Sequence, residues 1–225
     1  METTPPPAPD TVPVIPWEDR GRSPFDGLFE TVKLLATSPG EAFNRMPVEG
    51  GIGRPLFYAV AIGWLGVVVG IGWNLLFQGM WLPFVESAED LAGMGAMYGL
   101  TVGWGVLVAV LAPLFIILGI FVASAIFHLM LMMLGGAKNG FEATVRVVCY
   151  TQTAQLASLI PCCGSIIGLV WTIVLYTIGL STAHRTSQGK ALLAIFLPLV
   201  FCCVLWAVVF LVIGGIAGLA ALADQ

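Results

Sequence analysis

A long uncharged stretch in the middle of the chain constrains its fold most. Thr101 to Leu134 is 34 residues without a formal charge, and one helix of that length extends about 50 Å, against a hydrocarbon core of about 30 Å. The 225-residue chain is 58% hydrophobic and only 10% charged, whereas soluble domains carry about 25% charged residues. We therefore predict an all-α integral membrane protein. No turn residues surround Pro113, which favours one tilted, kinked helix over two short spans.

Further apolar runs predict a five-span transmembrane helical bundle. The remaining four spans cover about residues 55–77, 144–160, 164–183 and 191–215. Five spans place the N-terminus and the loops at 135–146 and 184–190 on one side, together with all nine Lys and Arg residues. Basic residues beside spans stay in the cytoplasm, so the N-terminus is predicted to be cytoplasmic and the C-terminus outside. A six-span arrangement would scatter these residues over both sides.

The part before the first span predicts a tail followed by two short helices. Residues 1–22 contain six prolines and are expected to form a disordered, proline-rich cytoplasmic tail. Residues 23–54 are expected to hold interfacial amphipathic helices, because Ser23-Pro24-Phe25-Asp26 and Ser38-Pro39-Gly40-Glu41 each carry an N-cap, a proline at N1 and an acid at N3. Their apolar faces would lie in the membrane interface or dock a protein partner. Residues 55–225 then form the transmembrane domain.

The span at 144–160 is the polar one, with candidate interaction residues Tyr150, Gln152, Gln155 and Ser158. Lipid cannot satisfy these groups, so this helix must lie inside the bundle. The polar side chains either join helices by hydrogen bonds or line a path for a small solute. His128 is an ionisable residue within a span, and it is either functional or a neutral histidine bonded to a neighbouring helix.

Regularly spaced glycines predict close helix packing. Gly66 and Gly70 are four residues apart in the first span, and Gly95, Gly99 and Gly103 repeat the spacing at the entry to the second. Small residues at this spacing let two helices approach closely.

No arrangement of residues predicts catalysis or a metal site. His128, His184 and Cys149 lack close ligand spacing. Ser124 and His128 share a helix face, but nothing supplies an oxyanion hole. Cys162 and Cys163 are expected to be packed thiols rather than a disulfide. We expect no catalytic residue, no metal, no cofactor and no nucleic-acid partner.

Short motifs along the chain suggest a family. They are Ser38-Pro39-Gly40-Glu41-Ala42-Phe43-Asn44-Arg45-Met46, Gly50-Gly51 with Arg54-Pro55-Leu56, Phe127-His128-Leu129 before Leu134-Gly135-Gly136, Phe141-Glu142-Ala143-Thr144, Arg146-Val147-Val148-Cys149-Tyr150, Ile160-Pro161 and Gly179-Leu180. In this order, with five spans, the chain resembles the Yip1 domain family over about residues 24–200. The resemblance implies a helical membrane protein without known catalysis, and eukaryotic members associate with Rab-type GTPases and with one another.

The acidic Asp-Leu-Tyr-Gly-Pro motif of the eukaryotic members is missing, so we expect a bacterial inner-membrane protein rather than a Rab partner. The expected function is membrane organisation or partner recruitment without catalysis. The alternative is a small-solute or ion transporter or channel subunit that uses the polar third span, and a membrane-bound enzyme comes third. Expected contacts are the lipid bilayer, a protein that docks on the N-terminal helices, and a second copy of the chain.

Overall fold

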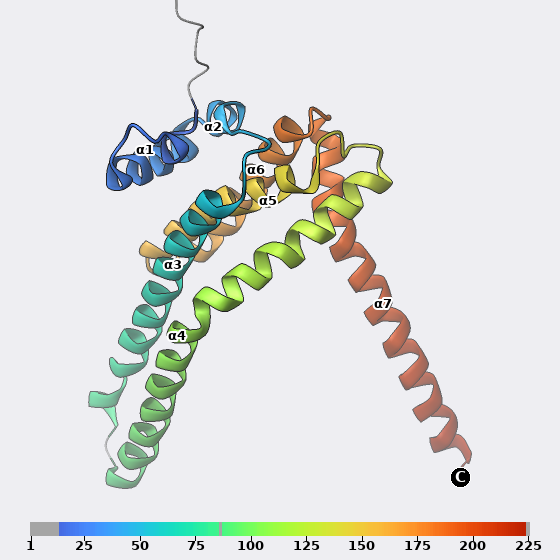
Figure 1. Cartoon of the computed structure of the whole chain (residues 1–225). Coiled ribbons are helices and arrows are strands. Elements are labelled where there is room, and N and C mark those ends of the chain that lie inside the picture. Colours follow the sequence, from blue (N-terminus) through green and yellow to red (C-terminus); the bar gives the residue numbers. More distant parts are fainter. Residues whose placement is uncertain (1–13, 86, 224–225) are drawn as a thin grey trace, which may run out of the picture.

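The computed structural model describes residues 14–85 and 87–223, and this part of the chain folds into helices without strands (Figure 1). Seven α-helices and three 3₁₀ helices follow one another in it. They are η1 (Pro16–Glu18), α1 (Pro24–Thr37), α2 (Pro39–Arg45), α3 (Gly53–Gly79), η2 (Leu82–Phe84), α4 (Ala88–Met133), α5 (Phe141–Thr151), η3 (Gln152–Leu159), α6 (Gly164–Ala183) and α7 (Gln188–Ala223).

Four segments of the described chain are long and apolar enough to cross a membrane. They are Gly53–Phe84, Glu89–Met133, Gly164–Ala183 and Gln188–Val212, and each overlaps most of a predicted span. The prediction of a multi-pass helical membrane protein is confirmed at this level. The predicted span at 144–160 is not among the four.

The segment at 144–160 is not one regular α-helix, which corrects the prediction. α5 ends at Thr151, and the chain continues as the 3₁₀ helix η3. Thr153 Oγ1 donates to Tyr150 O at 2.8 Å, and Thr151 Oγ1 donates to Val147 O at 2.8 Å. Threonine hydroxyls that bond to nearby carbonyls compete with the α-helical ladder, and the spacing of three residues at Thr153 is that of a 3₁₀ turn.

α4 is continuous through Pro113, as predicted, and Figure 1 shows it bending along its length. Proline has no N–H to donate to the carbonyl four residues earlier, which is that of Ala109. Trp64 Nε1 on α3 donates to Ala109 O at 2.8 Å. A neighbouring helix thus satisfies the carbonyl that Pro113 leaves free, as the hydrocarbon core requires.

The core gathers at one end of the molecule, around α5. Every residue from Ala143 to Thr151 is buried. α3, α4 and α6 pack against this helix, and buried residues of α1, α2 and the start of α7 belong to the same hydrophobic cluster (Figure 1). A Cβ on Gly179 of α6 would lie 2.6 Å from Val147 Cγ1 and 2.9 Å from the ring of Phe43. Only glycine lets α2, α5 and α6 meet there.

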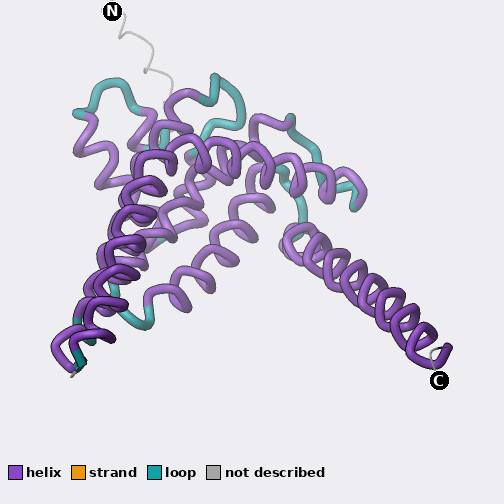
Figure 2. Tube along the Cα trace, turned by 90° about the horizontal axis from the view of Figure 1, so that it is seen from below, coloured by secondary structure: helices purple, strands orange, loops and turns teal. Residues whose placement is uncertain are grey.

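Away from this core the molecule opens into two arms. α3 and α4 run side by side, whereas α7 leaves in another direction (Figures 1 and 2). The large hydrophobic side chains of α7 from Leu199 to Val212 are exposed. Such a surface requires a lipid environment or a partner.

The N-terminal unit, which we define as residues 14–45 (η1, α1 and α2), includes residues assigned to the tail by sequence. The prediction of disorder is corrected for residues 14–22. Ile15 is fully buried, and its N–H donates to Arg45 O at 3.0 Å. Residues 1–13 lie outside the described part of the chain. Ser23 caps α1 as its sequence predicts, because Ser23 Oγ accepts from Asp26 N at 3.2 Å.

The Trp64–Ala109 hydrogen bond can be tested with a double-mutant cycle. Trp64→Phe should lower the free energy of unfolding by about 1 kcal/mol, because the Ala109 carbonyl loses its donor. In a Pro113→Ala background the same change should cost much less, since the introduced alanine has an N–H that can reach that carbonyl. Unfolding in detergent mixtures, followed by circular dichroism, measures both differences. An equal cost in the two backgrounds would contradict this role for Trp64.

Candidate functional site

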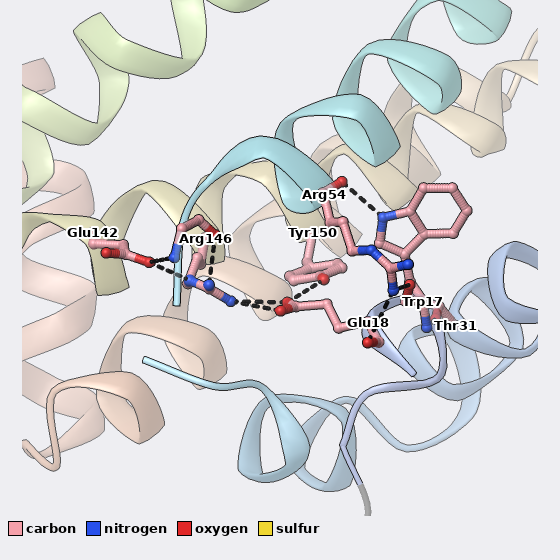
Figure 3. Close-up of polar contacts among 8 residues, drawn as sticks. Trp17, Glu18, Thr31, Arg54, Glu142, Arg146 and Tyr150 are labelled. Carbon is pink, nitrogen blue, oxygen red and sulfur yellow. Dashed lines mark hydrogen bonds and ion pairs between the residues drawn. The ribbon is translucent and has the colours of Figure 1, made fainter. Parts of the chain in front are cut away.

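Arg146 on α5 has no exposed surface, and a buried charge is costly unless it is paired and hydrogen-bonded. All three of its guanidinium nitrogens donate (Figure 3). Nε donates to Glu142 Oε1 at 3.0 Å, Nη1 to both carboxylate oxygens of Glu18 at 2.9 Å, and Nη2 to Gly51 O at 2.6 Å. The charge is therefore fully satisfied by three separate parts of the chain.

Glu18 comes from η1, 128 residues before Arg146. Tyr150 lies one turn after Arg146 on the same face of α5, and its hydroxyl donates to Glu18 Oε1 at 2.6 Å. Gly51 N, in the loop before α3, donates to Glu142 Oε1 at 2.7 Å. We call Glu18, Glu142, Arg146 and Tyr150 the arginine cluster. It joins the N-terminal unit to the helix at the centre of the core.

The backbone around Glu18 is fixed from two further sides. Arg54 Nη1 on α3 donates to Glu18 O at 3.0 Å, and Trp17 Nε1 donates to Arg54 O at 2.7 Å. Trp17 N donates to Thr31 Oγ1 on α1 at 2.8 Å, and the Trp17 ring stacks on Phe57 with centroids 6.0 Å apart. The carboxylate therefore reaches Arg146 from a rigid support.

A second polar cluster lies at the end of α4 and α6, and we call it the histidine cluster. Thr144 Oγ1 lies 2.9 Å from Nδ1 of His128 and 2.8 Å from Nε2 of His184. Asn139 N donates to Nδ1 of His184 at 3.3 Å. Since a backbone N–H can only donate, Nδ1 of His184 accepts and Nε2 donates to Thr144. The threonine hydroxyl can then donate to His128.

The histidine cluster is built for neutral imidazoles. Burial, with a smaller effect of His128, lowers the pKa of His184 to about 4, so His184 is uncharged near pH 7. His128 therefore lies bonded to a neighbouring helix, through Thr144. Cys149 is buried outside this pair, and no three His, Cys, Asp or Glu side chains of the described residues gather as metal ligands. Ser124 Oγ is buried and has no hydrogen-bond partner among them.

Two polar residues of η3, Gln155 and Ser158, face a groove rather than a closed core. Gln155 and Ser158 line a cavity of about 680 Å³ with Trp73 of α3 and Thr172 of α6. Ser158 is tied to α3, since Trp73 Nε1 donates to Ser158 O at 3.1 Å and Ser158 Oγ donates to Gly66 O at 3.3 Å. Gln155 is exposed in the groove.

No residue of α5 lines this groove in the described part of the chain. The residues of α5 from Ala143 to Thr151 are buried, including Val147, Val148 and Cys149. Gln152 is half-buried, and its Oε1 would lie 3.4 Å from a Cβ on Gly63. A continuous polar path of the kind that transport needs is therefore not formed by these side chains.

Of the five glycines expected at helix contacts, Gly66 lies at a close approach. A Cβ there would be 2.9 Å from Gln155 Cβ. A Cβ on Gly70, Gly95, Gly99 or Gly103 would meet nothing within 4 Å in the described part of the chain. Close packing at these four positions stays a prediction that needs a second chain.

The sequence did not identify the partners of Arg146. It placed Arg146 among the cytoplasmic basic residues, Glu18 in a disordered tail, and Thr144 and His184 outside the candidate set. A lone arginine within an otherwise uncharged segment is the one signal that a buried carboxylate must exist. The choice of Glu18 among 13 acidic residues could not be made without the fold.

Removal of one member of the arginine cluster should loosen the N-terminal unit. Glu18→Gln leaves Arg146 with less negative charge, and we expect it to lower the free energy of unfolding by about 3 kcal/mol. Trypsin should then cut faster after Arg20. In the Glu18→Gln background, Arg146→Met should lower the free energy of unfolding less than it does alone, because the ion pair between the two side chains is already weakened.

Asp19→Asn is the matched control for this cycle. Asp19 is the neighbouring carboxylate, half exposed, and its ion pair among the described residues is with Arg22, so its neutralisation should lower the free energy of unfolding far less than Glu18→Gln does. Additive effects of Glu18→Gln and Arg146→Met would show that the ion pair does not hold the unit in place.

Comparison with known proteins agrees with this architecture. The Yip1 domain family model matches residues 32–211, which include α2 to α6, most of both polar clusters and most of α7. No curated protein and no solved structure matches the chain. Since the match covers most of the 225 residues, the chain belongs to the Yip1 domain family of membrane proteins.

Proposed function

We propose that the chain crosses the bacterial inner membrane five times, with the N-terminus in the cytoplasm and the C-terminus outside. The third of these crossings, which is not among the four long apolar segments, is α5 with η3. Eleven α-helical residues and eight 3₁₀ residues, at rises of about 1.5 and 2.0 Å, extend about 32 Å, enough for a core of about 30 Å. The 3₁₀ geometry lengthens a short segment to membrane thickness.

The contacts between helix ends support an odd number of crossings. Lys138 Nζ, after α4, donates to Arg185 O, after α6, at 3.1 Å. Lys190 Nζ, at the start of α7, donates to Gly135 O at 3.4 Å. The ends of α4 and α6 therefore share one side, so the chain between α4 and α6 must cross before α6 returns. That shared side carries the basic loops.

A reporter that works only outside the cytoplasm tests this topology. It should be active when fused after Gln225 or inserted within residues 84–92, and inactive within residues 136–140. Activity within 136–140 would rule out the five-span arrangement. If the reporter is inactive after Gln225 but behaves as expected at the other two positions, the chain crosses the membrane four times.

The protein's role, we further propose, is to recruit a cytoplasmic protein partner through the N-terminal unit, without catalysis. The observation that carries this proposal is the arginine cluster, which fixes the unit to the bundle. α1 buries Gly27, Thr31 and Leu35 on one edge, whereas Phe25 is 87% exposed and Phe29 68% exposed on another. Two aromatic side chains one turn apart are typical anchors of a protein interface.

The charges of α1 favour a protein over a lipid surface as the main contact. Interfacial helices that bind lipid are rich in Lys and Arg on their polar face. α1 carries two carboxylates, Asp26 and Glu30, and one lysine, Lys33, so its charge is 1 − 2 = −1. An aromatic centre with a mixed polar rim suits a protein interface.

Copurification with matched variants tests the recruiting role. The full chain and a Phe25→Ser/Phe29→Ser variant would be purified in mild detergent, and copurifying proteins measured by mass spectrometry. Phe84→Ser is the control, since Phe84 is 76% exposed at the other end of α3. A stoichiometric partner should be retained by the wild type and the control and lost from the double variant. Retention by the double variant, or no stoichiometric partner at all, contradicts the proposal.

A further inference from the structure

A second groove lies between the two arms, where α4 and α7 diverge. Toward the C-terminal end of α4 and the N-terminal end of α7 the two helices are in contact, since Leu131, Ala191 and Ala194 are fully buried in one cluster. The groove below has a volume of about 690 Å³ and a nearly wholly apolar lining. Its walls include Ile126, Met130, Met133, Leu197, Phe201 and Val204. Methionine side chains adapt their shape to flexible apolar ligands.

Basic residues without acidic partners lie at the helix ends beyond this contact. Lys138, Arg185 and Lys190 are exposed, and none forms an ion pair with a carboxylate in residues 14–85 and 87–223. The three residues lie close together between the end of α4 and the start of α7, because Lys138 donates to Arg185 O and Lys190 donates to Gly135 O. We call this place the basic corner. This corner is positively charged and open to an anion.

We propose that this corner and the groove form a binding site for an anionic phospholipid. The phosphate lies near Lys138 and Lys190, and an acyl chain fills the groove between α4 and α7. Leu197 follows Lys190 by seven positions, which is about 10 Å along a helix. A headgroup and the start of the acyl chains are separated by a similar depth. Basic pockets between transmembrane helices on the cytoplasmic side suit anionic headgroups.

The lipid site requires that the basic corner lies at a membrane surface, and in this respect the inference rests on the proposed topology. A second copy of α7 is the other occupant that the exposed groove could hold. Charge favours the lipid, because α7 after Lys190 has no acidic residue within the described chain to meet three cations. A neutral apolar helix would leave the corner unpaired.

Native mass spectrometry of the purified full chain tests the headgroup half of the site. Dioleoyl phosphatidylglycerol should bind more tightly than dioleoyl phosphatidylcholine. Lys138→Gln/Lys190→Gln should weaken phosphatidylglycerol binding about 10-fold, since each lysine near an anionic headgroup contributes severalfold. Lys33→Gln, which removes an exposed lysine from α1, is the control and should change little. An equal loss in the control would show a general charge effect and overturn the site.

A substitution in the groove tests whether the groove binds an acyl chain. Ile126→Trp fills the groove and should displace the bound lipid, whereas Leu129→Trp, on the same helix but outside the groove lining, should not. Lipid binding unchanged by Ile126→Trp overturns the proposal. So does a stable dimer that retains no phospholipid, since a second copy would then cover the groove. A wrong topology would alter the reporter fusions without altering these variants' relative lipid binding.

Discussion

The burial of one guanidinium organises this structure. Arg146 sits in the middle of α5 with no exposed surface, and neither lipid nor a hydrophobic core can accept an unpaired positive charge. The chain must bring carboxylates to it. Glu142 comes from the same helix face, but Glu18 must come from the N-terminal unit, and its bidentate contact fixes that unit on the bundle. A closed polar network therefore lies within the packed helices at this end.

The same demand for satisfied polar groups explains other irregular features. Thr151 and Thr153 bond to nearby carbonyls where α5 becomes η3, Trp64 takes the carbonyl freed by Pro113, and Thr144 joins two histidines. Each of these hydrogen bonds satisfies a donor or an acceptor in a region without water. In contrast, the outer parts of α4 and α7 have few polar side chains and expose large apolar residues. Polar pairing and packing are concentrated at one end, and apolar surface at the other.

This division gives each end of the protein a different task. The end with the arginine and histidine clusters holds the N-terminal unit rigidly and presents Phe25 and Phe29 outward. The diverging arms offer apolar surface to lipid beneath a corner of basic residues. In the roles that we propose, a protein contact and a lipid contact would form on separate surfaces of one chain.

The sequence by itself determined the helical class, four segments that are long and apolar enough to cross a membrane, the capped start of α1 and the family. These follow from runs of apolar residues and from local motifs, whose physical effect does not depend on distant parts of the chain. Only the tertiary structure decided that 144–160 is divided into α5 and η3, that residues 14–22 are ordered, and that Gly66 lies at a close approach to η3. It also decided the partners of Arg146 and His128. Hydrogen bonds across 128 residues depend on which helices meet, and helix meeting is set by side-chain packing that no local pattern encodes.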